Sequence, residues 1–154
     1  MKFEPKHLPE QQVHALADFR FALRKFLHFS EAAAMQAGLT PQQHQLLLQI
    51  EGASAGTVTA VGYLAERLVL RHHSVVELSD RCEEAGLIVR MRDPHNRRQV
   101  VLELTGAGNR VLAELSAVHA RELTELGPEL IDALNVCIAD RTELDSIKPG
   151  EERQ

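Results

Sequence analysis

The stretch that decides the fold is Tyr63–Thr105, YLAERLVLRHHSVVELSDRCEEAGLIVRMRDPHNRRQVVLELT. It opens with a run, closed by Val69-Leu70, that keeps apolar residues at helical spacing with charged residues between them. A second helix is predicted from about His72 to Glu84. Its apolar face has offsets of three and four residues and comprises Val75, Leu78, Cys82 and Ala85. Gly86 is the predicted stop, because glycine enters the left-handed conformation after a helix at little cost.

Two strands joined by a basic loop follow this pair of helices. Residues 87–92 and 99–104 are strand-like, and the second run alternates polar and apolar side chains from Val101 to Leu104. The six residues between them, DPHNRR, indicate a turn by their proline and asparagine and are basic at the exit. Helix, turn, helix and hairpin in this order predict a winged helix-turn-helix, which is mainly α with a small β-wing.

Length and composition fit such a module with helical flanks. A chain of 154 residues favours one domain and allows a sizeable core. Its 44% hydrophobic and 25% charged residues are ordinary for a globular protein. The sequence has no run approaching the roughly 20 apolar residues of a membrane span, and MKFEPKHLPEQQ at the start does not resemble a signal peptide. We therefore expect a cytoplasmic protein with no membrane partner.

The formal net charge of −5 hides an uneven distribution. Residues 67–98 carry seven arginines against five acids, whereas residues 99–154 carry five bases and eleven acids. The positive excess therefore coincides with the helix-turn-helix and its basic loop. This local footprint favours double-stranded DNA as a partner, although the whole chain is acidic.

The N-terminal flank is predicted as a long helix over residues 11–37, with an apolar stripe of Phe19, Leu23, Phe26 and Leu27. Thr40-Pro41-Gln42-Gln43 has the residues of a capping box with proline at the first helical position, so a helix is expected over residues 41–51. Thr57-Val58 is a candidate third strand, and Thr59 is the predicted cap of the next helix.

The C-terminal flank is predicted as two helices, about residues 107–126 and 129–144, broken at Gly127-Pro128. Long amphipathic helices at both ends expose more apolar surface than the winged helix alone covers. They indicate burial against a second copy of the chain, a homodimer; the alternative is a monomer whose terminal helices fold back. We expect a single domain, 1–154, with a winged-helix region at 40–105 and a helical dimerisation region at 11–37 and 107–147.

From about Phe19 to Leu126 the sequence resembles the MarR family of bacterial transcription regulators. The matching segments are LTPQQH at 39–44, LAERL at 64–68, SVV at 74–76, DR at 80–81, EEAGL at 83–87, RDPHNRR at 92–98 and LTGAG at 104–108. Each is weak alone, and their order and spacing are specific. The resemblance implies a homodimer with intertwined terminal helices, in which two winged helices read a pseudo-palindromic operator. It also implies a repressor that a small anionic or phenolic effector releases from DNA.

The second helix of the motif is the expected recognition helix, because a helix fits the major groove and its first turns reach base edges. Its outward face carries the candidate DNA-binding residues Arg71, His72, His73, Ser74, Val76, Glu77 and Arg81. Arg71 stands where the family usually has a small cap, so the helix starts later or is capped by Ser74. Glu77 reads a base, pairs with Arg81, or weakens binding. The alternative for the whole face is ordinary solvated charge.

The basic loop supplies the other expected contact. Arg97 or Arg98 at its tip is a candidate for the minor groove, where narrow A·T tracts concentrate negative potential. The family pattern implies that Asp93 pairs with one of these arginines and stabilises the wing. The alternative is a charged hairpin tip that faces solvent.

Catalytic, metal and cofactor sites find little support. The eight histidines form no metal-binding spacing, although His44 and His119 are candidates to converge at the helix junction. No nucleotide-binding or nucleophile motif is present, so we expect neither an enzyme nor a cofactor. Cys82 and Cys137 form no CxxC pair, and Cys82 is interpreted as a core residue rather than a redox switch.

An effector would bind between the terminal helices and the winged helix. The candidate lining residues are Phe26, Phe29, His44 and Leu48, each of which has plain core packing as its alternative. For the whole protein, the function that competes with DNA-binding regulation is a winged-helix module for protein–protein contact without DNA binding.

Overall fold

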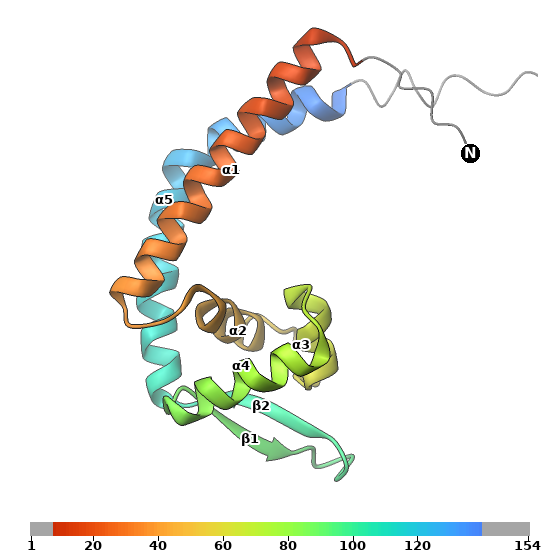
Figure 1. Ribbon diagram of the computed structural model, residues 1–154, viewed down its shortest axis with the longest axis vertical. Helices are drawn as coiled ribbons and strands as arrows, with labels where there is room; N and C mark the ends of the chain where they lie inside the picture. The colour runs from red at the N-terminus through yellow and green to blue at the C-terminus, as the bar shows by residue number, and fades with distance from the viewer. Residues whose placement is uncertain (1–7, 140–154) are drawn as a thin grey trace, which may run out of the picture. The chain divides into compact units, whose positions relative to one another are not determined.

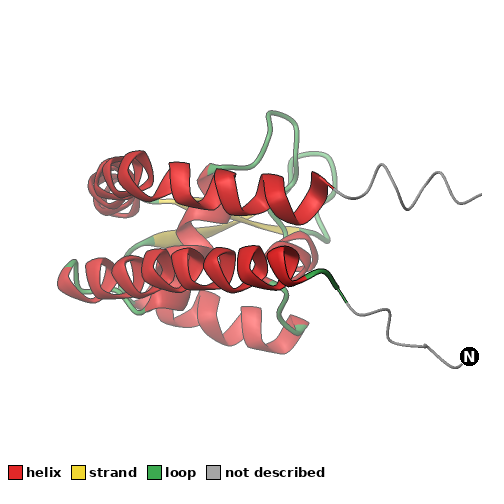
Figure 2. Ribbon diagram, turned by 90° about the horizontal axis from the view of Figure 1, so that it is seen from above, coloured by secondary structure: helices red, strands yellow, loops and turns green. Residues whose placement is uncertain are grey.

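The computed structural model describes residues 8–139 of the chain. It contains α1 (Glu10–Gln36), α2 (Pro41–Glu51), α3 (Val61–Leu68), α4 (His72–Glu84), β1 (Ile88–Arg92), β2 (Val100–Leu104) and α5 (Gly106–Ala139) (Figure 1). Helices dominate and the only sheet among these residues has two strands (Figure 2). The predicted fold class, mainly α with a small β-wing, is confirmed. No helix among the described residues is long and apolar enough to cross a membrane.

The chain divides into two compact units. One unit comprises residues 29–120 and contains the winged helix. The other comprises residues 1–28 and 121–154, of which 8–28 and 121–139 are described. Long helices α1 and α5 each contribute residues to both units.

The core of the winged-helix unit is made by apolar residues of every helix and both strands. Leu46 and Leu47 of α2, Leu64 of α3 and Leu102 of β2 have no exposed surface. At the start of α2, the Thr40 hydroxyl accepts from the Gln43 N–H at 3.1 Å, and the Gln43 side chain accepts from the Thr40 N–H at 2.9 Å. The predicted capping box is therefore confirmed, and it sets the point at which α2 enters the core.

Helix α4 begins and ends where the sequence predicted. Val75, Leu78 and Cys82 are buried, as expected, and Gly86 adopts a φ of +72° directly after the helix. The prediction was wrong at Ala85, which is exposed because it lies beyond the last helical residue. The fourth buried position is Ser79, whose hydroxyl donates to the Val75 carbonyl at 2.7 Å and so satisfies its polar group internally.

The two strands pair antiparallel with Ile88 opposite Leu104. The predicted third strand at residues 57–58 is wrong, since only an isolated bridge joins Ala60 to Val101. Thr59 is also not the cap of α3. Its carbonyl accepts from the Leu102 N–H at 3.0 Å and its hydroxyl donates to the Leu102 carbonyl at 2.7 Å, so Thr59 fastens the loop to β2. The N-cap of α3 is Ala60, without a side-chain hydrogen bond.

Helix α5 continues through Gly127-Pro128, where the sequence predicted a break. A proline inside a helix removes one backbone hydrogen bond and crowds the preceding turn, but packing on both sides can outweigh that cost. Leu126 and Ala133, which flank the proline, are both buried. Residues 140–147 of the predicted dimerisation region lie outside the described residues.

Candidate nucleic-acid interface

The outward face of α4 presents the residues expected to contact DNA. Arg71, His72, His73, Glu77 and Arg81 are exposed, and Ser74 and Val76 are half-buried. The helix starts at His72 with Arg71 as its N-cap and no side-chain cap, so it neither starts later nor uses Ser74. Within residues 8–139, Glu77 makes no ion pair with Arg81. The first turn therefore leaves backbone N–H groups and cationic side chains open at the same end of the helix.

The basic loop is held by hydrogen bonds of its own backbone. Asp93, which is only 6% exposed, accepts from the His95 N–H at 2.9 Å, and its N–H donates to the Gln99 carbonyl at 2.9 Å. The predicted ion pair of Asp93 with Arg97 or Arg98 is wrong for the described chain, because a buried carboxylate turned to the backbone does not meet these exposed side chains.

The two arginines of the loop are instead placed through their backbone. The Asn96 side chain accepts from the Arg98 N–H at 3.2 Å, and the Arg92 guanidinium donates to the Arg97 carbonyl at 3.2 Å. Both contacts leave the guanidinium groups of Arg97 and Arg98 exposed at the end of the hairpin. The arrangement suits binding of phosphate or an anionic groove.

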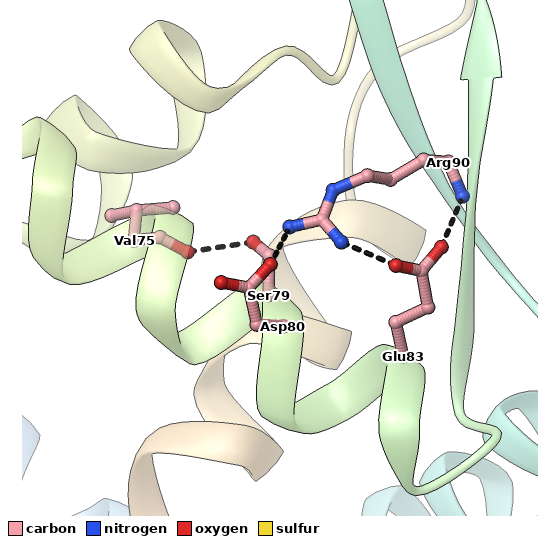
Figure 3. A network of polar contacts seen from close by, with 5 residues as sticks. All are labelled: Val75, Ser79, Asp80, Glu83 and Arg90. Carbon is pink, nitrogen blue, oxygen red and sulfur yellow. Dashed lines mark hydrogen bonds and ion pairs between the residues drawn. The ribbon is translucent and has the colours of Figure 1, made fainter.

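Arg90 of β1 joins the hairpin to α4 (Figure 3). Its guanidinium forms an ion pair with Asp80 at 2.5 Å and a second one with Glu83, and its backbone N–H donates to Glu83 at 3.3 Å. Burial alone would lower the pKa of Arg90, but the hydrogen bonds to Asp80 and Glu83 outweigh it and raise that pKa. Sequence reasoning had counted Arg90 only as part of the basic excess. The sequence signal that sequence reasoning overlooked was a pair of acids, Asp80 and Glu83, three residues apart on α4. They face Arg90, which is at an inward position of the next strand.

Two of the candidate effector residues surround a buried histidine. The His119 ring lies 4.9 Å from the His44 ring and 5.8 Å from the Phe29 ring. His119 also bonds the Ser30 hydroxyl at 2.7 Å and the Leu115 carbonyl at 2.5 Å. Burial, and after it the neighbouring His119, lower the pKa of His44.

The other two candidates differ in their surroundings. Leu48 is 37% exposed, and Phe26 belongs to the unit of terminal segments rather than to the winged-helix unit. Among residues 8–139, no three His, Cys, Asp or Glu side chains are grouped so as to hold a metal ion.

Residues 37–99 match the sequence profile of the MarR family. The uncharacterized HTH-type transcriptional regulator YcgE of Bacillus subtilis (strain 168) is 34% identical over 129 residues, which cover 79% of this chain and 82% of the relative. The chain belongs to the MarR family. It is a transcription regulator, and the predicted resemblance is confirmed.

Solved structures of MarR-family proteins share the fold. AbsC, a MarR family transcriptional regulator from Streptomyces coelicolor, superposes with a TM-score of 0.69 at 19% identity, covering 94% of this chain and 100% of AbsC. The transcriptional repressor CouR, bound to a 23-mer DNA duplex, superposes with a TM-score of 0.61 at 28% identity, covering 80% and 88% of the two chains. The family membership and the likeness to DNA-bound CouR favour DNA-binding regulation over the protein-interaction alternative.

The terminal unit of this MarR-family chain contains a hollow of about 580 Å³. Phe21, Ala133 and Val136 line it, and the ion pair of Lys25 with Glu129, at 2.8 Å, lies at its edge. Large apolar side chains of the same unit remain exposed, namely Leu8, Val13, Leu16, Phe21, Leu27, Leu123, Ile131, Leu134 and Ile138. Such a density of exposed apolar residues is typical of a surface that another chain covers.

Proposed function

We propose that this chain is a homodimeric, sequence-specific DNA-binding repressor that acts in the cytoplasm and has no catalytic activity. The observation that carries the proposal is the pair of cationic surfaces in the winged-helix unit. Arg71 and Arg81 are exposed on α4, Arg97 and Arg98 are exposed at the loop, and none of the four is in an ion pair among the described residues. Cations without an internal partner are available to phosphate.

In this proposal α4 enters the major groove. Arg71, His72, His73 and Ser74, in the cap and first turn, approach base edges and the backbone, and Val76 packs against a thymine methyl group. Glu77 accepts from a cytosine amino group, which is a donor that the major groove presents to an acid. Arg81, one turn further along, binds a phosphate. The loop supplies Arg97 and Arg98 to the minor groove, with Asp93 holding the loop's shape.

The dimer follows from the exposed apolar residues of the terminal unit. We propose that residues 11–37 and 107–147 of two chains pack together, with the partner chain filling the hollow beside Phe21. A twofold arrangement places two α4 helices on a pseudo-palindromic operator. Their separation has to be about 34 Å, so that they occupy successive major grooves.

Regulation by a small phenolic or anionic molecule completes the proposal. Phe29 and His44, which pack against His119, are the proposed effector contacts within the winged-helix unit, together with Leu48. An effector that alters the separation of the two α4 helices lowers operator affinity without touching the DNA-binding face. Direct competition by the effector at Arg71 or Arg97 would contradict this mechanism.

Selection of bound duplexes from a random pool at moderate salt tests the function. The expected result is a pseudo-palindromic motif with half-sites one helical turn apart, bound with an affinity that falls steeply as salt is added. Arg97→Ala and Arg98→Ala should each reduce the slope of log K against log salt by about one. Enrichment of no motif, with no binding to any duplex at low ionic strength, would overturn the proposal.

A further inference from the structure

Arg90 is the only described side chain that joins α4 to the hairpin by ion pairs. It lies on the same face of β1 as the buried Ile88, two residues earlier, so its side chain is directed toward α4. There its two terminal nitrogens bind Asp80 and Glu83 separately, while its backbone N–H holds a second oxygen of Glu83 (Figure 3). One arginine therefore spans two carboxylates three residues apart on the helix.

This contact reinforces the short connection between α4 and β1. Between the end of α4 and the start of β1 the chain has only Ala85, Gly86 and Leu87, with Gly86 at a φ of +72°. The backbone of that segment is tied to the last turn of α4, because the Gly86 N–H donates to the Glu83 carbonyl and the Leu87 N–H to the Cys82 carbonyl, both at 2.9 Å. Arg90 adds a contact further along the strand. This contact opposes rotation of the hairpin about the connection to α4, which would displace the loop at the far end of the hairpin.

The charge of Arg90 is neutralised by ion pairs within the protein, unlike that of the proposed DNA-binding arginines. Asp80 and Glu83 are about half exposed, whereas the Arg90 side chain is 26% exposed and shared between them. A guanidinium that lies against α4, with each terminal nitrogen bound to a carboxylate, is poorly placed to bind phosphate as well. Its contribution to binding is therefore geometric rather than a direct contact.

We propose that Arg90 is a positioning residue for operator recognition. By holding Asp80 and Glu83, it fixes the hairpin against α4, so that the loop enters the minor groove while the helix lies in the major groove. The inference rests on the proposed DNA binding. It assigns to Asp80 and Glu83 the role of anchoring Arg90, which their negative charge alone would not suggest. Two acids beside a DNA-binding face otherwise weaken binding by repelling phosphate.

The test compares Arg90→Gln and the double variant Asp80→Asn/Glu83→Gln with the wild type, on the selected operator and on a random duplex, over a range of salt concentrations. Arg90→Gln should lower operator affinity about tenfold, comparable with loss of one base contact. Its affinity for the random duplex should fall less than its affinity for the operator, because there the only effect is repulsion of phosphate by the two unpaired acids. Its salt slope should stay that of the wild type, because no phosphate contact is lost. Arg90→Lys, which keeps the charge but reaches one carboxylate, should fall between.

The double variant gives the sharpest discrimination, because two mechanisms predict opposite signs. Removal of two negative charges tightens binding if the acids only repel phosphate, whereas it weakens operator binding if they anchor Arg90.

Tighter operator binding by the double variant, or a salt slope reduced by about one in Arg90→Gln, would overturn the inference. If Arg90→Gln fails to fold in a thermal-melting experiment, the double variant decides alone, since its two positions are on an exposed helix surface. A wild-type protein that binds no duplex refutes the proposed function itself and is recognised before any variant is compared.

Discussion

Two histidine rings lie against each other in the interior of the winged-helix unit, and the burial of His44 makes the fold sensitive to pH. His44 is 2% exposed and His119 is 9% exposed, with the Ser30 hydroxyl and the Leu115 carbonyl occupying both ring nitrogens of His119. A second positive charge within a stacked pair is unfavourable, and so is any charge removed from water. The pKa of His44 is therefore lower in the folded protein than in the unfolded chain.

The free energy of unfolding should consequently fall as the pH is lowered through about 6.5, the ordinary histidine pKa. The sign follows from proton binding: the folded pKa of His44 is lowered, so the unfolded chain takes up more protons in this range. Urea unfolding at about pH 7.5 and about pH 5.5 measures the difference, which stays clear of most carboxylate titration. In the His44→Gln variant the free energy of unfolding should decrease less between these two pH values. An equal decrease in the variant and the wild type would show that other groups cause it.

Cys82 is a second buried group with a consequence for chemistry. Burial, only partly offset by Arg81, raises the pKa of the Cys82 thiol to about 11. Because the thiolate is the nucleophile, native Cys82 should alkylate at least about tenfold more slowly than the half-buried Cys137 at neutral pH. Mass spectrometry after timed iodoacetamide treatment measures both rates, and the difference should vanish in denaturant. Fast modification of native Cys82 would restore the redox-switch interpretation.

The sequence was sufficient to identify many exposed and buried residues but not their partners. Periodicity correctly placed Val75, Leu78 and Cys82 inside, because one helix face faces one core. It did not show that Asp93 binds backbone, or that Arg90 binds two acids, since these contacts depend on how a strand and a loop approach a helix. Charge counting assigned all seven arginines of residues 67–98 to one surface, whereas Arg90 is committed internally.

At the scale of elements, the junction between β2 and α5 explains why the chain has a glycine at position 108. Thr105 donates its hydroxyl to the Gly86 carbonyl at 2.6 Å and accepts from the Gly108 N–H at 3.1 Å, so it both caps α5 and fastens it to the end of α4. This draws the first turn of α5 onto the Leu87 backbone. A Cβ at Gly108 would stand 2.1 Å from the Leu87 carbonyl oxygen, which is backbone and has little room to move.

Gly108→Ala should therefore destabilise the protein by about 2 kcal/mol or more, as expected for overpacking against backbone. Gly106→Ala is the matched control: a Cβ there meets only the flexible end of Arg110 at 3.5 Å, so stability should be unchanged or slightly raised. Chemical denaturation of both variants measures the contrast. Equal stability of the two would show that the Leu87 contact is not restrictive.

The elements themselves were largely predictable, with failures that have local causes. The capping box correctly marked the start of α2, and Gly86 correctly marked the end of α4, since these signals depend on neighbouring residues. The break expected at Pro128 did not occur, because burial of Leu126 and Ala133 outweighs a local helix-breaking tendency. The strand expected at residues 57–58 failed because a single bridge at Ala60, with Thr59 bonded to Leu102, satisfies that loop instead.

At the scale of the whole molecule, the described chain leaves apolar residues uncovered. Ile131, Leu134 and Ile138 of α5 are between 40% and 59% exposed and recur at offsets of three and four residues, so they form one stripe. Burying an apolar side chain of this size stabilises by about 1.5–3 kcal/mol. A stripe of this kind on each of two chains, together with the exposed residues of α1, is a sufficient driving force for the proposed dimer.

The double variant Ile131→Glu/Ile138→Glu should therefore be monomeric at concentrations where the wild type is a dimer, because each chain would bury two charges at the interface. Operator affinity should fall by about a hundredfold or more, since two half-sites are no longer bound by one linked pair of winged helices. Val58→Glu, which alters an exposed apolar residue of the winged-helix unit, should leave the dimer intact. Sedimentation equilibrium measures the mass of each variant. A wild-type protein that stays monomeric at micromolar concentration would contradict the proposed dimer, and with it the binding of a pseudo-palindromic operator by two linked winged helices.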